Sequence, residues 1–257
     1  HNARLENEKA AEDFLAIAEK FPDDKNAERG ALNAVVTYSD VVKARREQRA
    51  AVAANLQDGL IHAIEVLLDR WGGREENAQW HFWLGWEYQD KAARAGTAAE
   101  DRLAMLRKAA AAYEKCPPGR PESLQAGKLA LDIRAELLRE MWDAAGEQGP
   151  AEARKLVDAL QAYAARAAAA VAEVEDEARA AVLKEWAAET ELSAIVLRYE
   201  RLGEKEQALK DVRAYQKKWD GTESGRRALE FEIRKLIEDG KTDEAIAKVR
   251  ALRQADP

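Results

Sequence analysis

Few residues in this chain of 257 could carry out chemistry. There are three histidines, and two of them, His62 and His81, fall on different expected helices with no cysteine or carboxylate set at the spacing of a metal site. His62 and Glu65 lie one helical turn apart, which would supply half of a site. The same spacing is typical of a polar pair on the surface of a helix, and this is the interpretation we favour.

The sequence also lacks the loops and motifs of common enzymes. Gly127 and Lys128 have no glycine five residues earlier, so they do not form a phosphate-binding loop. We find no motif for an activated nucleophile. Asp and Glu together number 48, so a pair of carboxylates carries no information without geometry. We therefore expect a protein that is not an enzyme and that uses no cofactor and no metal.

Aromatic residues gather between positions 80 and 88, and this cluster is the feature that stands furthest above background. A helix that is aromatic on every side is usually buried on every side, which would place in the core Trp80, Trp83, Leu84 and Tyr88. Phe82 and Trp86 lie four residues apart on a different face, next to Gln79 and Gln89. If these two rings are exposed, they would anchor a peptide whose backbone the amides could bind. The candidate partner-binding residues are therefore Gln79, Phe82, Trp86 and Gln89.

Composition and charge narrow the class of protein. The charged share is 35%, Gly and Pro are few, and no stretch alternates in the way a half-buried strand requires, so we expect an all-α fold. The net charge is −7 and the two signs are interspersed, which argues against nucleic acid as a partner. Cys116 is the only cysteine, which excludes an intrachain disulfide, and we expect it to be a small core residue. No apolar run approaches the roughly 20 residues that span a bilayer, so we expect no transmembrane segment.

Helical spacing and breaker residues predict about eleven helices along the chain. The polar run 43–49 is either a turn or the exposed part of a long helix. The clearest expected helices are 5–21, 26–44, one that ends at Trp71, 74–95, 98–116 and 122–145.

The middle of the chain, residues 151–186, is irregular. No Gly or Pro occurs between Ala151 and Leu202, and a single helix of that length would extend about 78 Å. We expect instead a turn at the acidic cluster 173–177, with Asp176 capping the helix that follows. The alanine-rich run 162–172 predicts a seam of close helix packing.

A short sequence pattern occurs twice near the C-terminus. Ala208 and Ala245 are 37 residues apart, and each follows a glycine, Gly203 or Gly240, by five residues. Weaker copies recur towards the N-terminus, so we expect one helical-repeat domain over residues 1–257. The first and last helices both correspond to the second half of a repeat, and we expect the chain to be an excerpt of a longer protein.

The pattern resembles the tetratricopeptide repeat. Leu84-Gly85 with Tyr88 is similar to that family's first-helix signature, although His81 stands where the family usually has Trp. The second helix matches through Ala109, Tyr113, Cys116 and Pro121, but about 12 extra residues separate the two halves. The repeats are also longer than the family's usual 34 residues, so they are irregular and elongated.

The resemblance implies a right-handed α-solenoid of antiparallel helix pairs. It also implies that the face with Phe82 and Trp86 lines a concave groove, and that the function is a non-enzymatic scaffold for a protein or peptide partner. The alternative is a helical accessory domain of a larger bacterial envelope enzyme or assembly, for example a peptidoglycan-processing one. The run that ends in Phe21-Pro22-Asp23-Asp24 resembles repeats of bacterial envelope proteins, which favours a periplasmic or envelope location over the cytoplasm.

Overall fold

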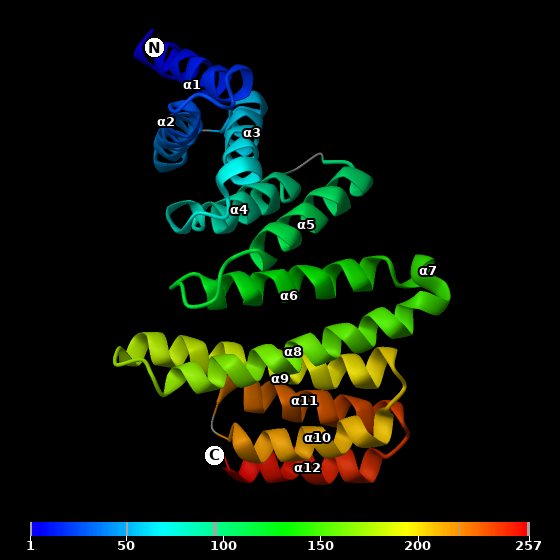
Figure 1. The fold of residues 1–257 in the computed structure, drawn as a ribbon. Helices are drawn as coiled ribbons and strands as arrows, with labels where there is room; N and C mark the ends of the chain where they lie inside the picture. Colours follow the sequence, from blue (N-terminus) through cyan, green and yellow to red (C-terminus); the bar gives the residue numbers. More distant parts are fainter. Residues whose placement is uncertain (1, 50, 95–96, 221, 256–257) are drawn as a thin grey trace. The chain divides into compact units, whose positions relative to one another are not determined.

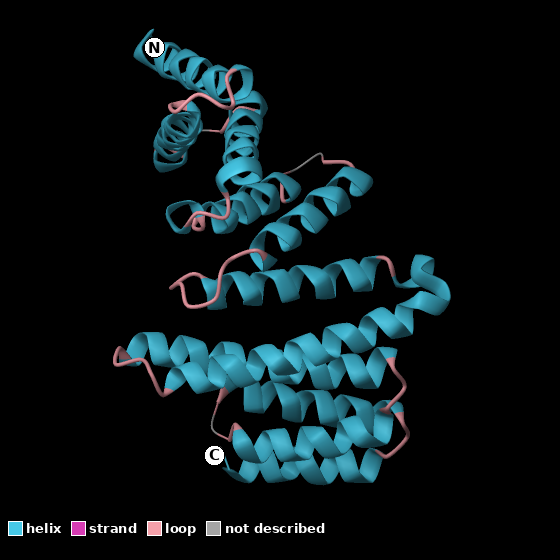
Figure 2. Ribbon diagram, viewed as in Figure 1, coloured by secondary structure: helices cyan, strands magenta, loops and turns pink. Residues whose placement is uncertain are grey.

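A computed structural model describes residues 2–49, 51–94, 97–220 and 222–255. Across these residues every regular element is a helix (Figure 2). Eleven α-helices have 13 or more residues, and a one-turn α-helix and two short 3-10 helices join them. The prediction of an all-α fold is therefore confirmed. Within the same described residues, no helix is both long and apolar enough to cross a membrane.

The chain divides into two compact units, His1–Leu137 and Leu138–Pro257, here called unit 1 and unit 2. Each is described by itself, and the expectation that both belong to one repeat array stays a prediction. Helix α6 (Ser123–Glu140) crosses the boundary. Unit 1 contains α1 (Asn2–Lys20), α2 (Ala27–Glu47), α3 (Ala54–Trp71), a 3-10 turn (Glu75–Asn77), α4 (Trp80–Ala92) and α5 (Ala99–Glu114). Unit 2 contains α7 (Trp142–Ala145), a second 3-10 turn (Gly146–Gln148), α8 (Gly149–Val171), α9 (Glu177–Arg201), α10 (Lys205–Lys218), α11 (Glu223–Glu238) and α12 (Thr242–Ala255).

In each unit, helices that follow one another in the sequence pack together, from α1 to α5 and from α8 to α12 (Figure 1). Some boundaries differ from the prediction. Helix α2 continues through most of the polar run 43–49 and ends at Glu47. The expected helix 74–95 begins only at Trp80, because residues 75–77 form the 3-10 turn, and the expected helix 122–145 is interrupted after Glu140.

The irregular middle of the chain folds as two helices, α8 and α9. Asp176 caps α9, since its Oδ1 accepts the backbone N–H groups of Ala178 at 2.9 Å and Arg179 at 3.1 Å. The predicted turn and its cap are confirmed. Of the predicted alanine seam, Ala164 and Ala167 are buried and Ala168 and Ala170 are half-buried. The other alanines of the run are exposed and only favour the helix.

Small residues allow the helices of unit 1 to approach closely. A Cβ atom added to Gly85 on α4 would lie 2.6 Å from the ring of Tyr113 on α5, so no larger residue fits there without displacing that ring. The Tyr113 side chain is 1% exposed, and its hydroxyl donates a hydrogen bond of 2.9 Å to Gln89. The glycine of the Leu84-Gly85 signature therefore has a packing role.

The alanine and the glycine of the repeated pattern in unit 2 have the same structural roles in both copies. Ala208 and Ala245 are 0% and 2% exposed, as expected for small residues where helices meet. Gly203 and Gly240 have φ values of +68° and +75°, a left-handed conformation that ends the preceding helix and favours glycine.

Two buried carboxylates each join three helices. In unit 1, Glu87 of α4 is 2% exposed and accepts hydrogen bonds from both Nη atoms of Arg46 on α2, at 2.8 and 2.9 Å, and from Nε2 of Gln57 on α3 at 2.9 Å. In unit 2, Glu232 of α11 is 0% exposed. Its partners are Arg213 and Gln216 of α10, each at 3.0 Å, and Lys248 of α12 at 2.8 Å.

The overpacking of Ala245 tests the register of the last repeat. Ala245→Trp should destabilise unit 2 by about 1 to 3 kcal/mol, because the new ring has no space in the buried position. Glu244→Trp is the matched control, since Glu244 is exposed. Thermal unfolding of both variants measures the difference, and a larger loss for Glu244→Trp would show that the register is wrong.

The pH dependence of folding tests the role of Glu232. Burial by itself raises its pKa, but hydrogen bonds from Lys248, Arg213 and Gln216 outweigh burial, so the pKa lies below the usual value of 4.5. A lowered pKa in the folded state stabilises the protein above pH 4.5, and this contribution is lost as the pH falls through the folded-state pKa. Glu232→Gln should thus lower the free energy of unfolding at pH 7 by roughly 2 kcal/mol, with a smaller difference from wild type in acid.

The control for this experiment is Glu230→Gln on the same helix. Glu230 pairs with Arg226 at the surface, where an ion pair contributes at most about 1 kcal/mol. Urea unfolding at several pH values measures both variants. A constant difference between Glu232→Gln and wild type from pH 7 to pH 3 would contradict the assigned role.

Candidate functional site

The predicted aromatic site does not form. Phe82 is only 7% exposed, and its ring centroid lies 5.6 Å from that of Tyr113 in the core of unit 1. Trp86 is 41% exposed, so the expectation that both rings are exposed on one face is wrong. The reason is that α4 packs against both α3 and α5, which buries the side of the helix that carries Phe82 and Gly85.

Other residues of the aromatic cluster also differ from the prediction. Trp83 was expected in the core but is 46% exposed, and Leu84 is half-buried, whereas Tyr88 is buried as predicted. Gln79 is exposed, but Gln89 is half-buried and accepts the hydroxyl hydrogen of Tyr113. The four candidate residues therefore do not form a common binding face.

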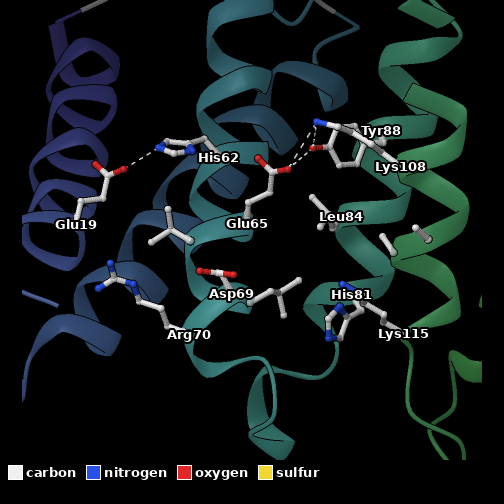
Figure 3. Close-up of a pocket in the computed structure, with 14 residues that line it drawn as sticks. Glu19, His62, Glu65, Asp69, Arg70, His81, Leu84, Tyr88, Lys108 and Lys115 are labelled. Atoms are coloured by element: carbon white, nitrogen blue, oxygen red, sulfur yellow. Dashed lines mark hydrogen bonds and ion pairs between the residues drawn. The ribbon is translucent and has the colours of Figure 1, made fainter. Parts of the chain in front are cut away.

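A groove opens elsewhere in unit 1, with a volume of about 760 Å³. Helices α3 and α5 form its two walls and α4, which packs against both, forms its floor, while Glu19 of α1 lies on the other side of α3 (Figure 3). None of the four candidate residues lines it. The lining residues are Glu19 of α1, His62, Glu65, Val66, Leu68, Asp69 and Arg70 of α3, His81, Leu84 and Tyr88 of α4, and Lys108, Ala111, Ala112 and Lys115 on the α5 side.

At one end of the groove the two walls are linked by side chains. The Tyr88 hydroxyl donates a hydrogen bond to Glu65, and Lys108 donates one of 3.2 Å to Tyr88 while its Nζ lies 4.0 Å from Glu65 Oε1 (Figure 3). Burial, and then Glu65, raise the pKa of Tyr88, which keeps its hydroxyl protonated as a donor. This contact connects α3, α4 and α5.

At the other end the walls carry unpaired charges of opposite sign. Asp69 on the α3 wall and Lys115 on the α5 wall are exposed and have no ion-pair or hydrogen-bond partner among the residues that the structure describes. His81 lies between them on the floor (Figure 3). Burial, and then Lys115, lower the pKa of His81, so the imidazole is mainly neutral at pH 7. This end of the groove therefore presents one negative and one positive group to an occupant.

Helix α1 supports the outer side of the α3 wall. His62 Nε2 lies 2.9 Å from Glu19 Oε1, and Arg70 Nη1 donates a hydrogen bond of 3.3 Å to the carbonyl oxygen of Ala18. The predicted surface pair of His62 with Glu65 is thus wrong, because each residue has a partner on another helix. Helical spacing places His62 and Glu65 side by side but does not show which neighbour competes for them.

Candidate metal ligands and nucleophiles are few near the groove among the described residues. Among the described residues, no group of three His, Cys, Asp or Glu could hold a metal ion. Cys116 follows directly after Lys115, but it is half-buried and burial raises the pKa of its thiol to about 11, so it is a poor nucleophile. It packs against the core of unit 1, as expected for a small apolar residue.

Part of this site follows a spacing that is visible in the sequence. The α3 wall follows the positions 62, 65, 66 and 69, and the α5 wall follows 108, 111, 112 and 115, both with helical periodicity. In the sequence, each row looks like an ordinary solvent-exposed face of a helix. Only the packing of α4 between α3 and α5 shows that the two rows border one groove.

The comparisons with known proteins do not add to this geometry. No protein-family model matches the sequence, and the search of curated proteins finds no match either. The site is therefore assigned from its residues alone.

Single substitutions in the aromatic cluster test the corrected assignment. Phe82→Ala should lower the free energy of unfolding by about 3 to 5 kcal/mol, because it removes a buried ring from the core of unit 1. Trp86→Ala should cost clearly less, about 1 kcal/mol, since the residue is already 41% exposed. Chemical denaturation measures both values, and equal losses would contradict the burial assigned to the two rings.

Proposed function

We propose that the protein is a non-enzymatic helical-repeat scaffold, and that the groove of unit 1 binds a segment of a partner protein. One observation carries this proposal. The groove has an apolar floor at Leu84 that is only half-buried, and it lies between the unpaired charges of Asp69 and Lys115. Apolar surface that remains in water next to unpaired charges is what a protein partner would cover.

The architecture supports a repeat scaffold. Successive helices pack in order along each unit, and Gly85, Ala208 and Ala245 lie at close helix contacts or buried positions, as the resemblance to tetratricopeptide repeats implies. Stacked helix pairs of this kind leave grooves that small domains with closed cores do not have. Membership of that family and a right-handed solenoid are part of the proposal.

The groups in the groove also favour binding over a reaction. The lowered pKa of His81 makes it a weaker base, and the raised pKa of Tyr88 makes it a weaker acid. A catalytic site usually shifts such pKa values towards the working pH. Glu65 and Lys108 are engaged with Tyr88 and hold the walls together.

Selection from a random library of displayed 12-residue peptides tests the function. The wild-type protein should enrich peptides whose binding is lost in the variant Ala111→Trp. Ala111 is exposed and lines the groove, so a tryptophan ring there would fill the space without disturbing the core. Fluorescence anisotropy of the enriched peptides should show at least about a tenfold weaker affinity for this variant, which corresponds to about 1.4 kcal/mol.

The matched control is Ala99→Trp, which is exposed on the same helix but does not line the groove. It should bind the enriched peptides as the wild type does. Circular dichroism shows whether both variants keep the fold. Absence of enrichment, or equal binding by Ala111→Trp and wild type, would refute the proposed function.

A further inference from the structure

We infer that the segment bound in the groove is an amphipathic α-helix of about two turns, with a basic residue on one flank and an acidic residue on the other. This inference rests on the proposed function and specifies the partner of the same site. It follows from the length of the walls, from the side chains that line them, and from the two unpaired charges.

The length of the groove matches a short helix. The α5 wall extends over eight residues, from Lys108 to Lys115, which is about 10 Å or two helical turns. A helix about 10 Å across fills roughly 420 Å³ per turn. The volume of about 760 Å³ therefore holds slightly less than two turns.

The lining side chains favour a helix over an extended peptide. An extended peptide exposes its backbone N–H and C=O groups, and each needs a partner when it is buried. None of the 14 residues that line the groove is Asn or Gln, and the charged groups of Glu65, Arg70 and Lys108 already have partners, so few side chains are left to bind an exposed backbone. A helix satisfies its own backbone, and it needs from the groove only apolar contact and charge. Leu84 and Ala111 provide the apolar contact.

The charges specify the flanks of this helix. Asp69 on one wall attracts a Lys or Arg of the partner, and Lys115 on the other wall attracts an Asp or Glu. The second pair of wall charges is not free, because Glu65 and Lys108 already interact through Tyr88. A helix with the same sign on both flanks would gain one attraction and suffer one repulsion. Since a helix can enter the groove in either direction, the order of the two flanks determines its direction and does not prevent binding.

Four synthetic 14-residue peptides with a common leucine stripe test the inference. The first has Lys on one flank and Glu on the other, the second has Lys on both, the third has Glu on both, and the fourth is the first with a central proline. The wild-type protein should bind the first peptide about three to ten times more tightly than the second or third, as expected for exposed charge pairs. It should bind the proline peptide roughly a hundred times more weakly, because proline breaks the helix.

Charge reversal in the protein should exchange these preferences. Lys115→Glu should prefer the peptide with Lys on both flanks, and Asp69→Lys should prefer the peptide with Glu on both. Both residues are exposed and without partners among the described residues, so neither change removes an existing contact. Circular dichroism and thermal unfolding of the variants check that their stability is unchanged.

Two outcomes would overturn the inference. One is a preference that stays the same in Lys115→Glu and Asp69→Lys, and the other is equal binding of the proline peptide. If peptides from the displayed library still bind the groove in either case, the proposed function stands and only the helical, two-sided partner is wrong. If no library peptide binds the groove, the function itself fails.

Discussion

The buried carboxylate of Glu87 fixes the part of unit 1 on which its groove depends. Removing a carboxylate from water is costly unless charged and polar groups pair with it, and the pairing atoms here come from Arg46 of α2 and Gln57 of α3. The three helices must therefore keep one relative position to satisfy it. Leu84 lies three residues before Glu87 on the same helix, so the groove floor is held by the same contact. The hydrogen bond of Tyr113 with Gln89 holds the other side of α4 against α5.

Unit 2 uses the same principle with different residues. Glu232 is fully buried between α10 and α12, and it joins them through Arg213, Gln216 and Lys248. Around these charged contacts, small residues set how closely the helices approach, and apolar side chains fill the remaining space. Buried ion pairs add less stability than apolar packing would, but they penalise any other register of the helices.

The groove combines a fixed end with an open end. At the fixed end, Tyr88 joins the two walls through Glu65 and Lys108, so the spacing of α3 and α5 does not depend on an occupant. At the open end, Asp69 and Lys115 leave opposite charges in water beside a neutral His81. In the proposed binding function, a preformed groove would lose little entropy when a partner binds, and its free charges would select among partners. The proposed binding of a peptide and the proposed charge preference for its flanks therefore depend on different parts of the groove.

The sequence by itself determined the helical fold and many of the positions at which helices begin and end. Helical periodicity, the cap at Asp176 and the glycine turns at Gly203 and Gly240 are local properties, because they depend on residues a few positions apart. The tertiary structure alone decided that Phe82 is buried while Trp83 is exposed, and that Glu87 is in the core. Periodicity shows which residues share a face, but on a helix with aromatic residues all round it does not show which face meets a neighbour. The groove could not be predicted from the sequence for the same reason. Its two walls are rows of ordinary surface residues, and only the packing of α4 between α3 and α5 brings them together.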